Sequence, residues 1–178
     1  MALKGGDKLE AKLKAMLGKL SQGEVLRVGF LETAKYPTGE QVAQVAFWNE
    51  YGTKTAPARP FFRNMIADKK GSWGTDLGKI LKAVDNDVPR ALAMMGGRIQ
   101  GELQQSIVDT NAPPLSPFTV MLRKVKQGRT DAPTTGADLA EARRRLAAGE
   151  STDGVNAKPL IYTNIMRSSV AYDIKDAE

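Results

Sequence analysis

Apolar side chains recur at helical spacing over four stretches of this 178-residue chain. In residues 7–21, leucine and methionine fall on one face and lysine and glutamate on the other, which predicts an amphipathic helix. The helical period returns over residues 41–51, from 60 to about 84, and from 87 to about 109. The last stretch predicts the long helix of the fold. Gly71 and Ser72 interrupt the third stretch, so either one bent helix or two helices would fit it.

Shorter runs rich in β-branched and aromatic residues predict strands. Residues 25–31 form one such run and are followed by a turn signal at 36–39. Residues 160–162 and 168–174 are also strand-like and would pair as a hairpin around the intervening turn. Residues 120–126 fit a strand or a helix equally well. The whole pattern predicts an α+β fold, in which several helices, including one long helix, pack on a small antiparallel sheet.

Residues 127–157 are the least hydrophobic part of the chain. They contain one helix-forming segment, residues 137–148, whose apolar stripe is thin. We therefore expect a single α+β domain over residues 1–178, with residues 127–157 as an extended inserted arm that buries little of the core. Deletion of this arm should leave the melting temperature nearly unchanged, because added loop length costs only about 0.6 kcal/mol per doubling.

Two short features within the helical stretches also carry structural expectations. Gly96 and Gly97 lie in the middle of the long helix, where each costs about 1 kcal/mol relative to alanine. A close backbone crossing would compensate, and a flexible defect is the alternative. Asp85-Asn-Asp87 resembles the start of a calcium loop, but the position for the closing carboxylate is Gly96. We therefore expect these polar residues to cap the long helix.

Residues 46–63 hold an unusual density of aromatic side chains. Gly52 lies where the helix over residues 41–51 needs a left-handed C-terminal residue, and Pro60 suits the first position of the next helix. Trp, Tyr and Arg are enriched among the residues that anchor protein interfaces. The candidates for a subunit interface are Trp48, Tyr51, Arg59, Phe61, Phe62 and Arg63. A core role in a helix–loop–helix corner is equally well supported for the two phenylalanines.

Three turn-rich segments occur in a defined order along the chain. They are Asn49-Glu-Tyr-Gly-Thr53 with Pro57-Ala-Arg-Pro-Phe-Phe-Arg63, then Pro113-Pro-Leu-Ser-Pro-Phe-Thr119 with Arg123-Lys124, and finally Lys158-Pro-Leu-Ile-Tyr-Thr163 with Ser168-Ser-Val170. In this order they resemble the virion morphogenesis proteins of long-tailed bacteriophages, the neck or tail-completion proteins that join head to tail. Asn164 stands where that family usually has glycine, and asparagine also tolerates a left-handed backbone.

The resemblance implies a structural protein without catalytic activity or cofactor. It would form a homo-oligomeric ring of six subunits, with twelve as the alternative, in the neck of the virion after assembly in the host cytoplasm. The implied neighbours are a head-side connector or adaptor and the tail terminator or tail tube, with genomic DNA passing non-specifically through an axial channel. A ring needs a heterologous interface, in which two different faces of each subunit meet. The family also passes more directly from its basic residue to Lys-Pro-Leu, which favours the inserted arm.

The composition narrows the possible chemistry and leaves one charged feature open. The chain has no Cys and no His, which excludes disulfides, thiol nucleophiles and histidine as a general base. Its net charge of +6 is modest for DNA binding. The densest basic run, Arg143-Arg144-Arg145, would contact DNA phosphate or an acidic neighbouring subunit, or else form a solvated helix face. A DNA-binding or packaging accessory protein is therefore the alternative function.

Other catalytic and membrane signals are weak or missing in the sequence. Residues 74–80 have one spacer too few for a phosphate-binding loop and place Ile80 where a metal-binding hydroxyl is needed. The sequence has neither a Ser-x-x-Lys pair nor a Gly-x-Ser-x-Gly elbow, so a hydrolase has little support. We expect no metal and no cofactor. We also expect no membrane partner, because no apolar run approaches the length that crosses a bilayer.

Overall fold

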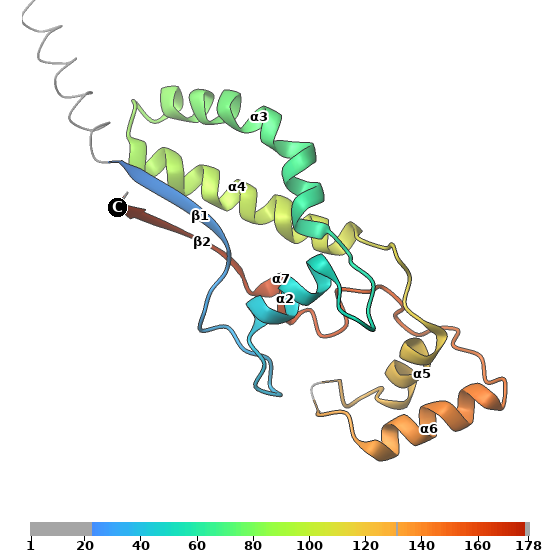
Figure 1. Cartoon of the computed structure of the whole chain (residues 1–178). Helices are drawn as coiled ribbons and strands as arrows, with labels where there is room; N and C mark the ends of the chain where they lie inside the picture. Colours follow the sequence, from blue (N-terminus) through green and yellow to red (C-terminus); the bar gives the residue numbers. More distant parts are fainter. Residues whose placement is uncertain (1–22, 131, 177–178) are drawn as a thin grey trace, which may run out of the picture. The chain divides into compact units, whose positions relative to one another are not determined.

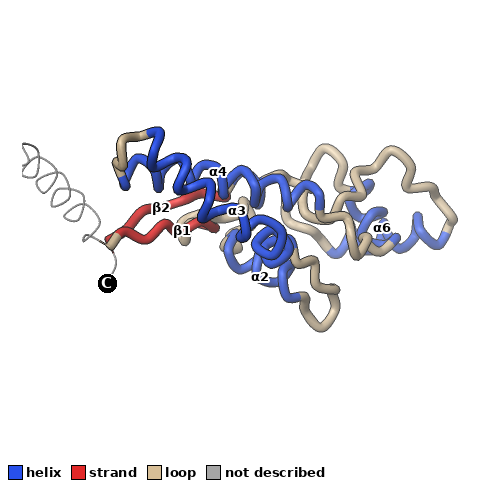
Figure 2. Tube along the Cα trace, turned by 90° about the horizontal axis from the view of Figure 1, so that it is seen from above, coloured by secondary structure: helices blue, strands red, loops and turns tan. Residues whose placement is uncertain are grey.

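The computed structural model describes residues 23–130 and 132–176, so the helix expected over residues 7–21 lies outside the described residues. Helices dominate the described part, and two strands form an antiparallel sheet (Figures 1 and 2). The elements are β1 (Glu24–Phe30), α2 (Val42–Tyr51), α3 (Phe61–Ala83), α4 (Val88–Asp109), α5 (Pro117–Val125), α6 (Gly136–Ala147), α7 (Ile165–Ser168) and β2 (Val170–Asp176). The predicted α+β class is confirmed.

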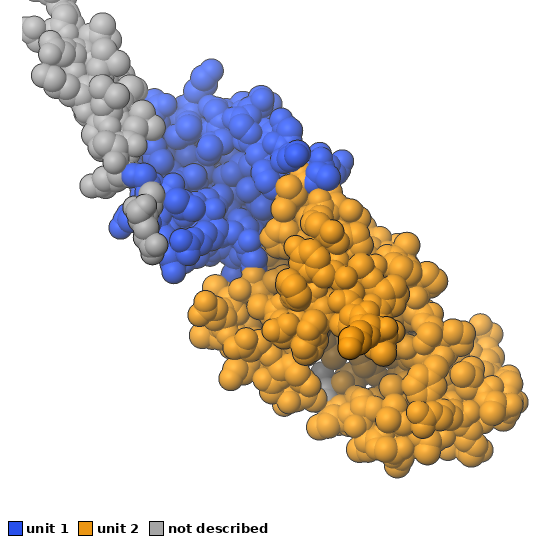
Figure 3. All heavy atoms as spheres, viewed as in Figure 1, with its two compact units in different colours: residues 1–29, 67–101, 171–178 blue, residues 30–66, 102–170 orange. Residues whose placement is uncertain are grey.

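The chain divides into two compact units (Figure 3). Within the described residues, unit 1 comprises 23–29, 67–101 and 171–176, and unit 2 comprises the remainder. The divisions fall inside α3 and α4, so each of these helices contributes residues to both units. The single domain over residues 1–178 stays a prediction.

Unit 1 combines the paired strands with parts of the two long helices. Asp76 in α3 and Arg98 in α4 form an ion pair of 2.8 Å. A Cβ atom placed on Gly96 would lie 2.5 Å from the Tyr172 ring and 2.9 Å from Leu26. The expected close approach at Gly96 therefore exists, but two side chains from the strands make it, rather than another backbone. The neighbouring Gly97 would meet nothing within 4 Å.

The predicted limits of the long helices agree with the structure. The stretch from residue 60 to 84 is one continuous helix, α3, so the glycine and serine within it do not divide it into two. Asp85 and Asn86 have left-handed φ angles of 53° and 59° after α3 ends. Asp87 Oδ1 then accepts a hydrogen bond from Arg90 N at 3.2 Å, so the predicted capping of α4 is confirmed.

The apolar core of unit 2 gathers side chains from all of its helices. The buried apolar side chains are Val42, Ala46, Phe61, Met65, Leu103, Ile107, Val120, Met121, Ala142, Leu160, Met166 and Val170. Phe61 is 1% exposed and meets Phe30 edge to face, with 6.3 Å between the ring centroids. Ser106 Oγ donates to the Phe61 carbonyl at 2.6 Å, which fixes the start of α3 against α4 within this unit.

The structure decides one open alternative and corrects one predicted strand. Residues 120–126 fall mainly in a helix, α5, where Ser116 Oγ accepts the Thr119 amide at 3.2 Å as the N-cap. Residues 160–162 are not a strand, because the chain continues into the short helix α7 and β2 pairs with β1 instead. Asn164 has a φ of 61°, which confirms the expected left-handed turn.

Residues 127–157 belong to unit 2 and include α6. α6 begins with a capping box, in which Thr135 Oγ1 accepts the Asp138 amide and Asp138 Oδ2 accepts the Thr135 amide. Ala142 on α6 is fully buried, and α6 packs against α5. The segment expected to project as an arm is therefore in contact with the preceding helix.

Candidate functional site

α2 exposes three aromatic side chains, which we call the aromatic face: Phe47, Trp48 and Tyr51 are 55%, 45% and 55% exposed. Phe47 and Tyr51 lie one helical turn apart, with ring centroids separated by 4.7 Å. The Arg63 guanidinium lies 4.8 Å from the Tyr51 ring centroid. On the opposite side of α2, Val42 and Ala46 are buried. The helix therefore packs into unit 2 on one side and exposes aromatic side chains on the other.

Glu50 connects the end of α2 to the start of α3. Its buried carboxylate accepts hydrogen bonds from the Phe62 amide at 2.8 Å, the Arg63 amide at 3.1 Å and Arg63 Nε at 2.8 Å. Arg63 Nη2 also donates a hydrogen bond of 2.9 Å to the Glu50 backbone carbonyl. A carboxylate at this position satisfies free helix amides and interacts favourably with the helix dipole. This Glu50–Arg63 clasp therefore fixes the aromatic face relative to α3.

The loop between α2 and α3 is tightly built around Gly52. This glycine has a φ of 79°, and a Cβ atom on it would lie 2.8 Å from Ala58 N and 3.0 Å from Ala56 O. The φ is positive, as the predicted left-handed residue requires, but a ψ of 175° places Gly52 outside the left-handed helical conformation, and the position also lacks room for a side chain. The Arg59 amide donates to the Asn49 carbonyl at 2.6 Å, which brings the end of the loop back to α2.

Arg59 reaches from this loop to the proline-rich second segment. Its Nε donates to the Pro113 carbonyl at 2.8 Å, and its Nη2 donates to the Pro114 carbonyl at 3.2 Å. The side chain is buried, and this desolvation lowers the pKa of its guanidinium. Arg59 thus binds two backbone carbonyls more than fifty positions away.

Arg123 makes an equivalent connection to the third segment. Its Nη1 donates to the Asn156 and Lys158 carbonyls at 2.8 and 2.7 Å, and Nη2 donates to the Pro159 carbonyl at 3.0 Å. The guanidinium also lies 4.6 Å from the Tyr162 ring centroid. Burial is the main cause of its lowered pKa. The three turn-rich segments singled out from the sequence are therefore joined within unit 2, because each arginine binds the segment that follows.

The predicted interface residues divide by exposure. Trp48, Tyr51 and Arg63 reach the surface, and Phe62 is half-buried. Phe61 and Arg59 are buried inside unit 2 and take part in the contacts described above. Sequence reasoning left out the exposed Phe47, although its spacing of four residues from Tyr51 on a predicted helix was an available signal. The interface role of the exposed residues stays a prediction.

Acidic side chains neutralise most of the positive charge of the arginine run on α6. Arg144 Nε and Nη2 bind Glu141 at 2.8 and 2.7 Å, and Arg145 Nε binds the same carboxylate at 2.6 Å. Hydrogen bonds from Arg144 and then from Arg145 lower the pKa of Glu141 to about 2. Arg143 instead lies 5.6 Å from the Phe118 ring centroid. These contacts favour the solvated helix face over a surface that binds phosphate.

Within residues 23–130 and 132–176, no group of three or more Asp, Glu, His or Cys side chains is placed to hold a metal ion. No helix in those ranges is both long and apolar enough to cross a membrane. Comparison of the chain with protein-family models, with curated proteins and with solved structures found no match.

Proposed function

We propose that this chain is a structural protein of a bacteriophage neck, which forms a homo-oligomeric ring that joins the head connector to the tail and leaves a channel for DNA. The order of the three resembling segments is the first support. The second support is that Arg59 and Arg123 connect these segments by hydrogen bonds, so that three separate short motifs form part of one folded unit.

The observation that carries the proposal is the aromatic face on α2. Exposed groups of large apolar side chains mark interaction surfaces, and Trp and Tyr are frequent anchors. The Glu50–Arg63 clasp holds this face in one geometry, which reduces the entropy lost when a partner binds. In a ring, this face would contact a different face of the next subunit.

The proposed ring has six subunits, with twelve as the alternative. Its neighbours would be a head-side connector or adaptor and the tail terminator or tail tube, and its location would be the virion. The DNA-binding alternative has less support, because Glu141 compensates two of the three arginines that suggested it.

Complementation of a phage that lacks this gene would test the proposal. Trp48→Ala and Tyr51→Ala should lower the number of joined heads and tails, counted by electron microscopy, and the titre of infectious particles. Met94→Ala is the matched control, because Met94 is also 50% exposed but belongs to unit 1, whereas the aromatic face belongs to unit 2.

Each variant must first show the wild-type cooperative melt. Normal titres from a folded Trp48→Ala protein would refute the interface role. DNA affinity of the isolated chain that falls steeply with salt, and does not depend on Trp48, would favour the packaging alternative.

A further inference from the structure

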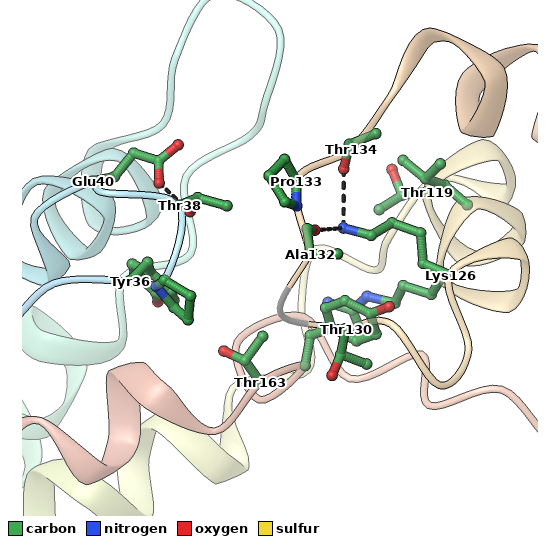
Figure 4. A pocket seen from close by; sticks show the side chains of 14 residues that line it. Tyr36, Thr38, Glu40, Thr119, Lys126, Thr130, Ala132, Pro133, Thr134 and Thr163 are labelled. Atoms are coloured by element: carbon green, nitrogen blue, oxygen red, sulfur yellow. Dashed lines mark hydrogen bonds between the residues drawn. The ribbon is translucent and has the colours of Figure 1, made fainter.

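Unit 2 contains an open cavity of about 650 Å³, separate from the aromatic face. One wall is the turn from Tyr36 to Glu40, and the other comprises α5 together with Thr130 and the segment Ala132–Thr134. Figure 4 shows Tyr36, Thr38 and Glu40 across the cavity from Lys126, Ala132 and Thr134.

Lys126 on the α5 wall is a buried cation, 6% exposed, with only neutral partners in the described part of the chain. Its Nζ donates to the Ala132 carbonyl at 2.6 Å and to Thr134 Oγ1 at 3.2 Å (Figure 4). An ammonium group has three N–H donors, so the two bonds that Nζ makes within residues 23–130 and 132–176 leave one donor for a further acceptor. A buried charge without a counter-charge is costly, and an incoming anion would reduce that cost.

Arg123 adds a second buried positive charge to the same wall. Within the described residues, its hydrogen bonds all go to carbonyl oxygens, which accept these bonds but carry no net charge. Thr119 and Thr130 on this wall also line the cavity, as does Thr163. Hydroxyls can donate to an oxyanion. This wall therefore provides both positive charge and neutral donors.

The opposite wall restricts which anion can enter. Glu40 accepts a hydrogen bond from Thr38, and this bond is the main cause of its lowered pKa, so Glu40 is charged at neutral pH. A polyanion such as nucleic acid would place several negative charges near this carboxylate. A single carboxylate on the Lys126 side meets less repulsion from Glu40 than a polyanion does, because it carries one charge and lies on the opposite wall.

We propose that the cavity binds an acidic side chain of an extended peptide segment from a partner protein, with the carboxylate on Lys126 Nζ and the neighbouring threonine hydroxyls. The cavity volume accommodates a few residues of peptide rather than a duplex. This site goes beyond the proposed ring interface, and its test uses the isolated chain, so it can fail or succeed whatever the outcome for the neck assignment.

NMR titration of the isotope-labelled full chain would test the site. The probe is the peptide acetyl-Gly-Glu-Gly-amide, and the matched neutral probe is acetyl-Gly-Gln-Gly-amide. The acidic peptide should shift the amide signals of residues that line the cavity in a saturable way, while the neutral peptide should bind at least about tenfold more weakly, since hydrogen bonds to charged groups are the stronger ones. Equal binding of both peptides would overturn the proposal.

Two variants test the walls separately. Lys126→Met should weaken binding of the acidic peptide about tenfold or more, because it removes the ammonium but keeps the length of the side chain. Glu40→Gln should strengthen binding about two- to threefold by removing repulsion across the cavity. Lys82→Met, on the exposed part of α3, should leave binding unchanged.

Each result has a defined meaning. Unchanged binding in folded Lys126→Met, or weaker binding in Glu40→Gln, would overturn the proposal. If Lys126→Met does not fold, the exposed Glu40→Gln and the peptide pair still decide the question. Inorganic phosphate or a hexathymidine oligonucleotide that saturates the cavity signals at lower concentration than the acidic peptide would show a phosphate site instead.

Discussion

Glu50 illustrates how one buried carboxylate can position a surface several residues away. The first turn of α3 has no acidic residue of its own, so its free amides need an acceptor from elsewhere. Glu50 supplies that acceptor from the end of α2 and also binds the Arg63 side chain. The same residue thereby fixes Tyr51, its neighbour in sequence, on the exposed side of the helix.

At this scale, burial separates two aromatic residues that the sequence grouped together. Phe61→Ala should lower the free energy of unfolding by about 3–5 kcal/mol, because it leaves a cavity in the core of unit 2. Trp48→Ala should lower it by about 1 kcal/mol or less, because that side chain is largely at the surface. Urea unfolding of both proteins measures the difference. Equal losses would mean that the aromatic face is part of the core.

Asp138 should make the stability of unit 2 sensitive to acid. The Thr135 amide, then the Arg129 guanidinium and the Thr135 hydroxyl, donate to its carboxylate and hold its pKa well below the ordinary value of 3.8. Because the folded pKa is lower than the unfolded one, the stabilisation is complete above 3.8 and is lost as the pH falls through the folded value.

Melting temperatures measured from about pH 7 down to about pH 2 should therefore fall more steeply for the wild type than for Asp138→Asn. The difference between the two proteins isolates Asp138 from the other carboxylates, including Glu141, whose pKa is also lowered. Parallel pH profiles would show that the capping box contributes no pH-dependent stability.

At the scale of elements, the sequence predicted helices better than it predicted what holds their ends. The period of apolar residues located α2, α3 and α4, since a helix that buries one side repeats its pattern locally. The error at residues 160–162 has a different origin. The carbonyls just before them bond to the Arg123 side chain rather than to a strand, and Arg123 lies more than thirty positions earlier. Local periodicity carries no information about such a contact.

The two adjacent glycines of α4 form a natural matched pair. Gly96→Ala should destabilise the protein by about 1–3 kcal/mol, because the new methyl group would overlap the Tyr172 ring and Leu26. Gly97→Ala should stabilise it by up to about 1 kcal/mol, since that position is open and alanine favours helix. Thermal unfolding of both variants provides the measurement. A stabilising Gly96→Ala would argue against the close packing of the strands on α4.

The contacts of α6 change the expected result of removing residues 127–157. Replacement of this segment by a short Gly-Ser bridge would expose the side of α5 that packs on α6 and remove acceptors from Arg123 and Lys126. We therefore expect a clearly lower melting temperature rather than the unchanged one predicted from composition. The triple change of Arg143, Arg144 and Arg145 to Gln keeps α6 and should alter melting much less. An unchanged melting temperature after the deletion would support the original prediction that residues 127–157 form an arm separable from the core.

At the scale of the whole molecule, the sequence predicted the α+β class and named the segments that meet in unit 2, but not how they meet. The helix–loop–helix corner could be read from Gly52 and Pro60, because backbone restrictions are local. The contacts of Arg59 and Arg123 could not be predicted in this way, because nothing in the sequence distinguishes an arginine that binds distant carbonyls from one that lies exposed at the surface. Burial separated the interface candidates only once the fold was known.

The proposed ring predicts two different states of association. The purified chain should be monomeric or weakly associated, because an aromatic face of three side chains is small for a stable interface. In the particle it should be present in six copies, or in twelve. Mass photometry of the purified chain and of isolated necks would measure both states. One copy per neck, or a stable two-fold dimer in the particle, would exclude the ring.

The carbonyl contacts of Arg59 and Arg123 bear on how such a protein can diverge over evolution. Every residue type provides a backbone carbonyl, so loop positions such as Lys158 can change without removing the acceptor that the guanidinium uses. No other side chain offers the same forked set of donors, so the arginines themselves are far less replaceable. Homologues could then share this unit while most of their loop residues differ, and the spacing of their arginines would be a better guide to kinship than overall identity.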